Sequence, residues 1–317
     1  MKKRPFVLAF LLLANTLHLI GQDRDPRKVK DKSSAAFGKK QQGVKKSQKQ
    51  LLLSYEAPQS NSNQALPHQG DGIINMYAVV VGVGNYSDMP QLDYTDDDAQ
   101  FFYNHLISRS GGSIPEDHIR LLINSKATRA NILQALETLS SRADEDDVFI
   151  FYFSGHGDEG CFLPIDYNGF QNQIWHQEII NLLDDSPARQ KVCFADACFS
   201  GAINNSQVFA AKSNTGRMPA SNSFYEAFAR ASNGTALFMS SSPGEVSLED
   251  RRLQHGVFTY FLMRGMAGEA DENADGIVNI RELYNYVYKT VIGHTGGIQS
   301  PVLSGDFDGS LPVSMPH

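Results

Sequence analysis

Two residues able to act together in nucleophilic chemistry each follow a short apolar run. His156 comes after residues 148–153, and Cys198 comes after residues 192–195, 42 positions beyond the histidine. A thiol ionises with a pKa of about 8.5, so a catalytic cysteine needs a neighbouring imidazole to accept its proton. Histidine exchanges protons close to neutral pH. The pair predicts acyl transfer, with Cys198 as nucleophile and His156 as general base. On residue types alone, a core role for both residues is an equal alternative.

The backbone beside this pair is suited to an acyl-transfer intermediate. Gly157 follows the histidine directly, and a glycine lets a substrate backbone approach closely. The negatively charged oxygen of the intermediate needs backbone N–H donors. We expect the N–H groups of Gly157 and Cys198 to supply this oxyanion hole.

The elements that must position these residues alternate along the chain. Runs typical of buried strands cover residues 77–84, 118–123, 148–153, 192–195 and 235–240. Apolar residues at helical spacing cover 96–108, 128–142, 174–183 and 282–291. This alternation predicts an α/β fold with a mainly parallel sheet flanked by helices on both faces. Sites in such sheets form beyond the carboxyl ends of the strands, where His156 and Cys198 both fall.

The amino terminus has the features of a secretory signal. Lys2, Lys3 and Arg4 precede an apolar stretch at residues 6–20. Fifteen residues are fewer than the ~20 that a membrane-spanning helix needs. We therefore interpret residues 1–22 as a signal peptide rather than an anchor, and expect a secreted or periplasmic protein with no stable membrane anchor.

The segment that follows is basic and polar. Residues 1–50 carry 13 Lys and Arg against 3 Asp, although the whole chain is acidic, with 28 basic and 35 acidic residues. Residues 23–75 have little helical or strand periodicity, so we expect a disordered prosegment or linker. The lysines alternate with Gln, Ser and Gly rather than with aromatic residues, and nucleic acid is not an expected partner.

The cysteine content limits the role of disulfides. Three cysteines are an odd number and too few for a disulfide framework, even in an exported protein. We expect Cys161 and Cys193 to be small buried apolar residues.

A second motif suggests a calcium site. Residues 271–282 match the twelve-residue EF-hand loop, in which oxygen ligands at alternate positions surround one ion and a glycine permits the turn. The motif predicts a possible structural Ca²⁺ with the ligands Asp271, Asn273, Asp275, the carbonyl of Ile277 and Glu282. Against this, acidic turns also occur without metal, and no second such loop accompanies this one.

The surroundings of His156 and Cys198 decide between a core and a catalytic role. Residues 152–157 (Tyr-Phe-Ser-Gly-His-Gly) and 196–201 (Asp-Ala-Cys-Phe-Ser-Gly) resemble the paired signatures of the caspase, metacaspase and paracaspase superfamily, peptidase family C14. The resemblance extends over residues 77–312. It implies a caspase–haemoglobinase fold and a cysteine endopeptidase with a Cys–His dyad, whose chemistry requires no cofactor.

Within that superfamily the chain looks more like metacaspases and bacterial orthocaspases. Asp196 stands where true caspases have Gln. The resemblance implies an S1 pocket made of Asp98, Ser154 and Asp196, and two convergent carboxylates favour Arg or Lys and repel an acidic P1 side chain. Helix capping is the alternative role for the acids at 96–98. Residues 174–179 lack the paired Asp residues that bind activating calcium in metacaspases, which puts that calcium switch in doubt.

The same resemblance divides the catalytic domain, residues 76–317. It implies a p20-like part at 76–205, a loop at 206–223 and a p10-like part at 224–317. An enzyme that cleaves after basic residues can cut its own exposed segments, so we expect autocleavage at Lys212 or Arg217. Two alternatives remain open: a catalytically silent caspase-fold interaction module, and a calcium-binding secreted protein.

Overall fold

The computed structural model describes residues 70–316 except 159, 198–233 and 243. All the described residues lie in one compact unit, residues 65–317. The expected signal peptide, most of the prosegment, Cys198 and the expected cleavage loop fall outside the described residues.

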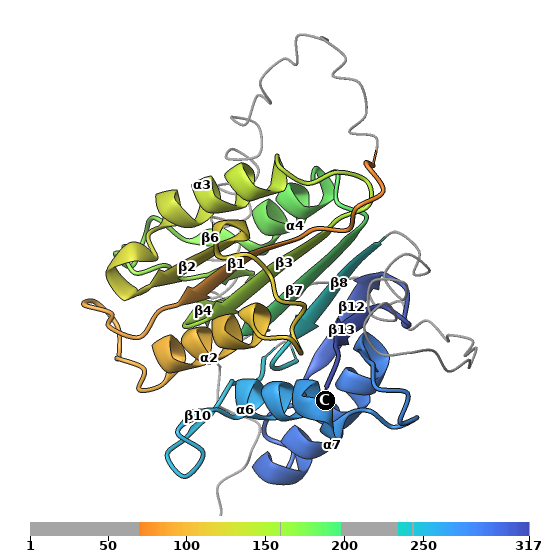
Figure 1. Ribbon diagram of the computed structural model, residues 1–317. Helices are drawn as coiled ribbons and strands as arrows, with labels where there is room; N and C mark the ends of the chain where they lie inside the picture. Colours follow the sequence, from red (N-terminus) through yellow and green to blue (C-terminus); the bar gives the residue numbers. More distant parts are fainter. Residues whose placement is uncertain (1–69, 159, 198–233, 243, 317) are drawn as a thin grey trace, which may run out of the picture. The chain divides into compact units, whose positions relative to one another are not determined.

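A six-stranded sheet with the order β12-β8-β7-β3-β1-β2 forms the centre of this unit (Figure 1). Five neighbouring strands are parallel, and β12 at one edge is antiparallel. Their bounds are β1 (Met76–Gly82), β2 (Ile119–Ile123), β3 (Val148–Ser154), β7 (Gln190–Asp196), β8 (Gly234–Met239) and β12 (Val302–Asp306). The mainly parallel α/β sheet predicted from the sequence is confirmed, but its antiparallel edge was not predicted.

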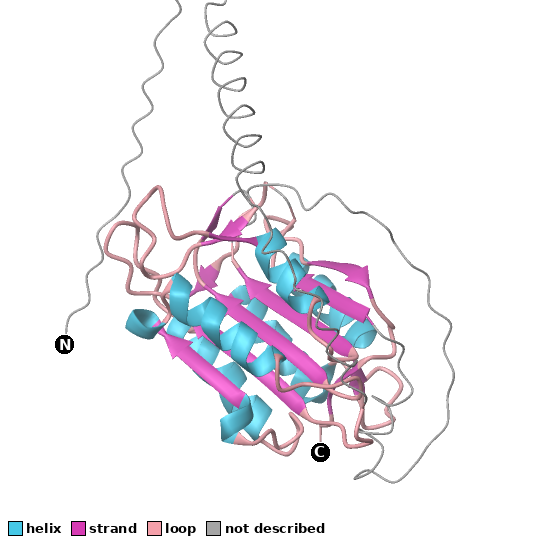
Figure 2. Ribbon diagram, turned by 90° about the horizontal axis from the view of Figure 1, so that it is seen from above, coloured by secondary structure: helices cyan, strands magenta, loops and turns pink. Residues whose placement is uncertain are grey.

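Helices cover both faces of the sheet (Figures 1 and 2). On one face lie α3 (Arg129–Ser140) and α4 (His176–Asp184), and on the other lie α2 (Thr95–Ile107), α6 (Val257–Arg264) and α7 (Ile280–Thr295). The short helical turns are η1 (Glu116–His118), η2 (Asn124–Lys126) and η3 (Gly265–Glu269). Two apolar layers therefore sandwich the sheet.

The central strands are buried on both sides because their side chains alternate between these layers. In β1, Ala78 and Val80 belong to the layer under α2, α6 and α7, whereas Val79 and Val81 belong to the layer under α3 and α4. This is the two-residue period of a strand with two covered faces. It explains why β1 reads as a continuous apolar run rather than an alternating one.

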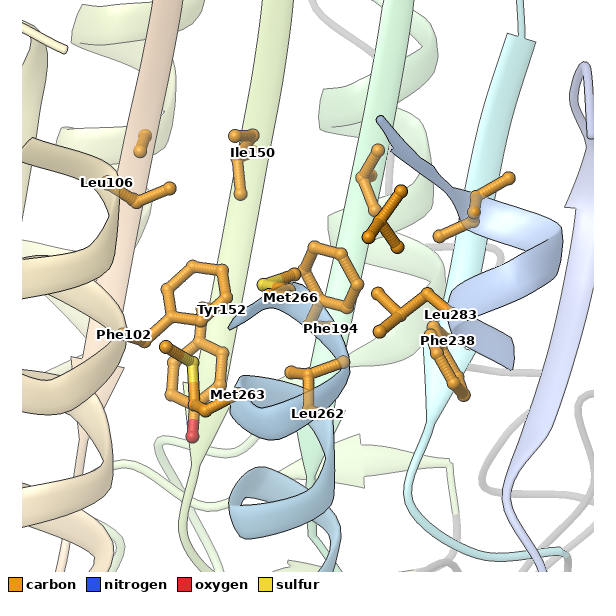
Figure 3. Packing of buried hydrophobic residues seen from close by; sticks show 14 of the residues in the cluster. Phe102, Leu106, Ile150, Tyr152, Phe194, Phe238, Leu262, Met263, Met266 and Leu283 are labelled. Carbon is orange, nitrogen blue, oxygen red and sulfur yellow. The ribbon is translucent and has the colours of Figure 1, made fainter. Parts of the chain in front are cut away.

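Aromatic packing joins α2 to the middle of the sheet (Figure 3). The rings of Phe102 and Tyr152 stack with centroids 4.4 Å apart, and Phe194 lies 5.6 Å from Phe102. All three side chains are buried. Truncating such a ring to Ala costs about 3–5 kcal/mol of stability, so the position of α2 on the sheet is strongly fixed.

Three small sheets surround the central one. The first joins β4 (Gly157–Asp158), β5 (Cys161–Phe162) and β6 (Ile174–Trp175), the second joins β9 (Glu249–Asp250) and β10 (His255–Gly256), and the third joins β11 (Val278–Asn279) and β13 (Pro312–Ser314). These strands are too short to show a two-residue period.

One helix boundary differs from the prediction. The helix expected from Ile174 begins at His176, because Ile174 and Trp175 pair with β5 instead. The carboxylate of Glu178 accepts a hydrogen bond from the Trp175 N–H, at 2.9 Å, and fixes this start.

The burial of two cysteines agrees with expectation. Cys161 and Cys193 are both buried and free. Burial raises the pKa of Cys161 to about 11 and that of Cys193 to about 12, so both thiols stay protonated and unreactive at neutral pH. In the described part of the chain, no helix is long and apolar enough to cross a bilayer.

Candidate active site

The sheet register brings the two sequence motifs to one place. Ser154 and Asp196 are partners in the parallel pair β3–β7, and each is the last residue of its strand. His156 and Cys198 therefore follow this pair by the same two residues. The strands stay joined one step further, because the Gly155 N–H donates to the Asp196 carbonyl at 3.1 Å. Cys198 lies outside the described residues, but the chain leading to it is described.

Ser240 forms hydrogen bonds with both backbone groups of Ala197, the residue before Cys198. The Ala197 N–H donates to Ser240 Oγ at 3.1 Å, and the same hydroxyl donates to the Ala197 carbonyl at 3.0 Å. Ser240 is fully buried and follows β8 directly. Its own N–H donates to the Ala195 carbonyl at 2.8 Å. This clamp fixes the backbone up to the residue that precedes the thiol.

The hydrogen bond made by the His156 ring defines its tautomer. Nε2 lies 2.7 Å from the carbonyl oxygen of Pro90. A carbonyl can only accept, so in this contact Nε2 carries the proton. The neutral imidazole then has its lone pair on Nδ1, and Nδ1 is the nitrogen available to take a proton from a thiol.

Tyr86, which sequence reasoning did not single out, supports this histidine. Its hydroxyl donates to the Leu163 carbonyl at 2.7 Å and accepts the His156 N–H at 3.0 Å. The two rings are in contact, with centroids 4.8 Å apart. Burial raises the pKa of Tyr86, which therefore stays neutral and able to donate. An added Cβ at Gly155 would lie 2.8 Å from this hydroxyl, so the glycine beside the histidine is required by packing.

The three residues expected in the S1 pocket are brought together. Asp98 comes from α2, and Ser154 and Asp196 come from the ends of β3 and β7; all three are buried. A Cβ built on Gly256 would lie 2.4 Å from Asp196 Oδ2 and 2.9 Å from Asp98 Oδ2. Both carboxylates thus converge on the same glycine backbone, where no side chain would fit.

Neutral donors hold the carboxylate of Asp196. Its Oδ1 accepts from Ser247 Oγ, and its Oδ2 accepts from the Thr259 N–H at 3.1 Å and from Thr259 Oγ1 at 2.8 Å. Burial raises the pKa of Asp196, although these hydrogen bonds oppose the shift. The carboxylate is therefore oriented without a neutralising charge of its own.

Asp98 has a different set of partners. Its Oδ2 accepts from the Gly256 N–H at 3.0 Å and lies 3.5 Å from Ser154 Oγ, and its Oδ1 lies 2.6 Å from His255 Nδ1. Burial and the nearby charge of Asp196 raise the pKa of Asp98 to about 7, against the opposing hydrogen bond from His255. Strongly shifted carboxyls of this kind are typical of functional sites.

The helix-capping alternative does not account for Asp98. The side chain of Tyr94, the N-cap residue of α2, makes no capping hydrogen bond, and the Asp98 carboxylate bonds across to β10. Sequence reasoning missed His255, Ser247 and Thr259 because their pairing with acids depends on contacts between residues at least 51 positions apart.

Gly157 occupies the start of β4, where it pairs with Phe162. Its role as an oxyanion donor stays a prediction. The other expected donor, the N–H of Cys198, lies outside the described residues.

The EF-hand-like loop has the turns of a cation-binding loop. Asp271 accepts from the N–H groups of Asp275 and Gly276, at 3.2 and 3.0 Å, and Asn273 accepts from the Asp275 N–H at 2.8 Å. Gly276 has φ +83°, which a side chain would strain. Burial, together with the charges of Asp275 and Asp271, raises the pKa of Glu282 to about 7. The charges of Asp271 and Asp275 thus reach Glu282, but the ligand atoms of these three residues do not all lie within 4.8 Å of one another.

The EF-hand-like loop at residues 271–282 pairs with a strand and not with a second loop of this kind. Its strand β11 pairs with β13 near the carboxyl end of the described chain. Asn279 and Glu282 also form a reciprocal capping box at the start of α7. The loop is therefore braced from both sides, and the oxygen donors present are those that Ca²⁺ prefers.

The sequence is similar to known peptidase domains. The family model described as the caspase domain matches residues 75–310. Metacaspase-4 of Arabidopsis thaliana is 29% identical over 146 residues, 40% of this chain and 34% of that protein. Metacaspase-1 of Eremothecium gossypii is 27% identical over 149 residues, 40% of this chain and 32% of that protein. A probable protease of a Desulfuromonadales bacterium is 23% identical over 249 residues, 68% of this chain and 29% of that protein.

The chain thus spans about a third of the length of these curated relatives. Among solved structures, the crystal structure of a structural-genomics target protein from Geobacter sulfurreducens matches with a TM-score of 0.48 and 18% identity. The match covers 73% of this chain and 93% of that one.

Proposed function

Because the chain belongs to the caspase family, we propose that it is a cysteine endopeptidase that hydrolyses peptide bonds after Arg or Lys. The observation that carries this proposal is the convergence of two buried carboxylates, Asp98 and Asp196, on Gly256. They lie beside the strand ends that lead to His156 and Cys198. A cationic P1 side chain is the ligand that such a pair of acids would stabilise.

The proposed reaction begins with proton transfer from Cys198 Sγ to His156 Nδ1, while Nε2 keeps its proton against the Pro90 carbonyl. The thiolate adds to the scissile carbonyl carbon, and the resulting oxyanion accepts hydrogen bonds from the N–H groups of Gly157 and Cys198. The C–N bond then breaks as Nδ1–H gives its proton to the leaving amine. Water adds to the thioester with proton transfer to Nδ1, and cleavage of the C–S bond releases the acid and restores the thiol.

Substrate selection follows from charge. A guanidinium or ammonium group entering the pocket would meet two carboxylates that no Lys or Arg of the described residues neutralises. An acidic P1 side chain would meet the same two groups as a repulsive pair. We therefore assign Asp98, Ser154 and Asp196 to P1 recognition.

Self-processing is part of the proposal. Lys212 and Arg217 lie within the segment between β7 and β8, and a peptidase with this preference would accept either as P1. The basic leader offers further sites. We also propose that residues 1–22 direct export and that maturation removes the segment up to the start of β1.

A bound calcium ion is proposed for the loop at residues 271–282. The carboxylates of Asp271 and Asp275, the side-chain carbonyl of Asn273, the main-chain carbonyl of Ile277 and the carboxylate of Glu282 would hold it. The loop adjoins α7 and β13, so the ion would stabilise the carboxyl-terminal part of the fold. The proposed peptidase chemistry requires no metal.

The test is hydrolysis of fluorogenic peptides that differ only in P1, ending in Arg, Lys or Asp, by full-length protein with calcium or with a chelator. Cleavage after Arg and Lys that is lost in Cys198→Ala supports the proposal. Cleavage after Asp would overturn the pocket assignment. Silence with every peptide, from folded protein with matured termini, would favour a catalytically silent interaction module.

A further inference from the structure

One histidine contacts the acidic pair Asp98 and Asp196, which the proposed function takes as the P1 site. His255 is the first residue of β10 and immediately precedes Gly256, on whose backbone the two carboxylates converge. Its Nδ1 lies 2.6 Å from Asp98 Oδ1. Its side chain is 22% exposed, whereas that of Asp98 is fully buried. His255 therefore contacts the buried acid from the side that reaches solvent.

Aromatic rings fix the orientation of this imidazole. The ring of Phe101, one helical turn beyond Asp98, stacks against it with a centroid separation of 5.2 Å and an interplanar angle of 28°. The ring of Tyr260, from α6, is the second aromatic neighbour, with ring centroids 6.2 Å apart. The imidazole thus has a defined place between α2 and α6.

The pocket needs a counter-ion. Two buried carboxylates close together repel each other and are costly to ionise without a nearby positive charge. In the described part of the chain, no Lys or Arg forms an ion pair with Asp98 or Asp196, and His255 is the basic group in contact. An imidazolium at this place compensates for one of the two negative charges.

We propose that His255 is the resident counter-ion of the P1 pocket: its imidazolium pairs with Asp98 while the pocket is empty and gives up its proton when a basic side chain enters. This inference rests on the proposed function, since it takes the pocket of Asp98 and Asp196 as the P1 site. It makes His255 a specificity-determining residue, because it couples recognition of a positive charge to the release of a proton.

The charges around His255 agree with this role. The hydrogen bond to Asp98 and the charges of Asp98 and Asp97 raise the pKa of His255 above its ordinary value, although burial opposes them. Asp196 lies beyond Gly256. Opposite His255 in the β9–β10 pair, the Asp250 carboxylate bonds to Arg252 and His294 instead. Tyr260 is the titratable group facing from α6.

The sign of the coupling follows from linkage. A raised pKa means that the folded, empty pocket favours the imidazolium. A second positive charge at Asp98 shares the carboxylate and repels the imidazolium, so the pKa of His255 falls when a basic ligand binds. By reciprocity, the ligand binds more weakly at pH values below the pKa that His255 has in the empty pocket. The affinity falls by up to about tenfold per pH unit.

The experiment follows the protonation of His255 directly, because Asp98 also titrates in the same pH range. Full-length Cys198→Ala protein carrying ¹³C-labelled histidine is titrated from acid to alkaline pH by NMR, with and without saturating benzamidine as the P1 cation. His255→Asn, or His255→Gln if the first variant does not fold, identifies the His255 resonance. His294 is the matched control: its Nε2 lies 2.9 Å from Asp250, and its side chain is 24% exposed.

Benzamidine is expected to lower the titration midpoint of His255 by about one pH unit or more, a tenfold loss of proton affinity, and to leave that of His294 in place. An unmoved His255 midpoint with benzamidine bound would overturn the inference. So would a His255 that is neutral throughout in the empty pocket, or a pocket that binds no benzamidine at any pH.

This outcome is separable from that of the peptide assay. Hydrolysis after Arg with an unmoved His255 would retain the proposed function and reject the counter-ion role. A benzamidine-dependent shift in a protein that hydrolyses no peptide would retain the counter-ion and reject the peptidase.

Discussion

The carbonyl oxygen of Pro90 lies 2.7 Å from Nε2 of His156 and so determines which nitrogen of the ring can act as a base. A main-chain group performs the orienting role that a carboxylate side chain has in many catalytic triads. A backbone carbonyl cannot be removed by substitution, and its position depends on the segment that joins β1 to α2. The geometry of the proposed dyad is therefore tied to the central sheet.

His156→Ala is expected to lower kcat/KM for an Arg peptide by about 10²–10⁴, the usual contribution of a general base. Cys198→Ala should abolish hydrolysis. Both are measured with fluorogenic peptides after circular dichroism confirms the fold. His294→Gln is the control, because the ring of this histidine bonds to Asp250 and not to His156, Asp98 or Asp196. Full activity of His156→Ala would refute the base assignment.

Tyr86→Phe tests the support of the histidine. The substitution removes the hydroxyl that accepts from the His156 N–H and donates to the Leu163 carbonyl. It leaves one buried and one part-buried backbone group short of a partner, so urea unfolding should show a loss of about 1–3 kcal/mol in the free energy of unfolding. A fall in kcat at nearly constant KM should accompany it, since substrate binding is not touched.

Tyr284→Phe serves as the control for Tyr86→Phe, because Tyr284 packs by its ring against Phe238 on the other side of the sheet. Equal effects of the two substitutions on kcat would show that Tyr86 has no special role.

Asp98→Asn separates recognition from chemistry. It removes one of the two pocket charges while preserving shape, so KM for an Arg peptide should rise roughly 10- to 100-fold, the worth of a hydrogen bond between charged groups, with a smaller change in kcat. Asp97→Asn, one residue earlier and exposed, is the matched control. Unchanged KM in Asp98→Asn would remove this carboxylate from the P1 site.

The same variant should alter how stability depends on pH. Asp98 has a folded-state pKa of about 7, well above that of an unfolded Asp, and the pKa of His255 is also raised. In both cases the folded state holds more protons than the unfolded state, so stability is lost as pH rises through the folded-state values.

The free energy of unfolding of the wild type, measured with urea, should therefore be lower at pH 8 than at pH 5. In Asp98→Asn this difference between the two pH values should be smaller by roughly 2–4 kcal/mol. A wild type and variant with parallel pH profiles would contradict the raised pKa values. Because the comparison is between two proteins at the same pH, titration of distant groups cancels.

Calcium should stabilise the protein through the EF-hand-like loop. At a calcium concentration of about 100 times Kd the expected gain is about 2.7 kcal/mol, read as a rise in Tm by scanning calorimetry. Affinity should fall as the pH drops through about 7, because Glu282 must lose its proton to bind the ion. Glu282→Gln should abolish the gain, and Glu272→Gln, at a non-ligand position of the loop, should keep it.

Self-processing is tested on the intact chain. Purified wild type should show cleavage after Lys212 or Arg217 by intact mass and N-terminal sequencing, and Cys198→Ala should stay whole. A double Lys212→Ala and Arg217→Ala variant should lose these fragments but keep its peptide hydrolysis. Active wild type that stays at its unprocessed mass would refute self-processing.

The central sheet was predictable because its strands are buried on both faces and read as apolar runs. β1, β3 and β7 were each located within three residues at either end. β12 was missed because Val302–Asp306 contains Ser304, Gly305 and Asp306 and is apolar only at its start. Its place at the sheet comes from antiparallel pairing with β8, a contact that local composition does not encode.

The site was predictable to the extent that short motifs carry it. Ser154, His156 and Asp196 lie in two such motifs, and Asp98 follows from a family resemblance. Tyr86 and His255 could not be located, because neither stands in a distinctive pattern and each acts through contacts 70 or more positions away. The residues next to Tyr86 in the sequence do not indicate that its hydroxyl bonds to the backbone of His156 and Leu163.

The burial of Cys161 and Cys193 has a practical consequence for counting molecules. With both thiols held protonated, a mild alkylating reagent applied to native protein has Cys198 as its one remaining target among three cysteines. If Cys198 is the nucleophile, as proposed, the number of labels per chain measures the fraction of chains with a reactive Cys198, and any value above one indicates unfolded material.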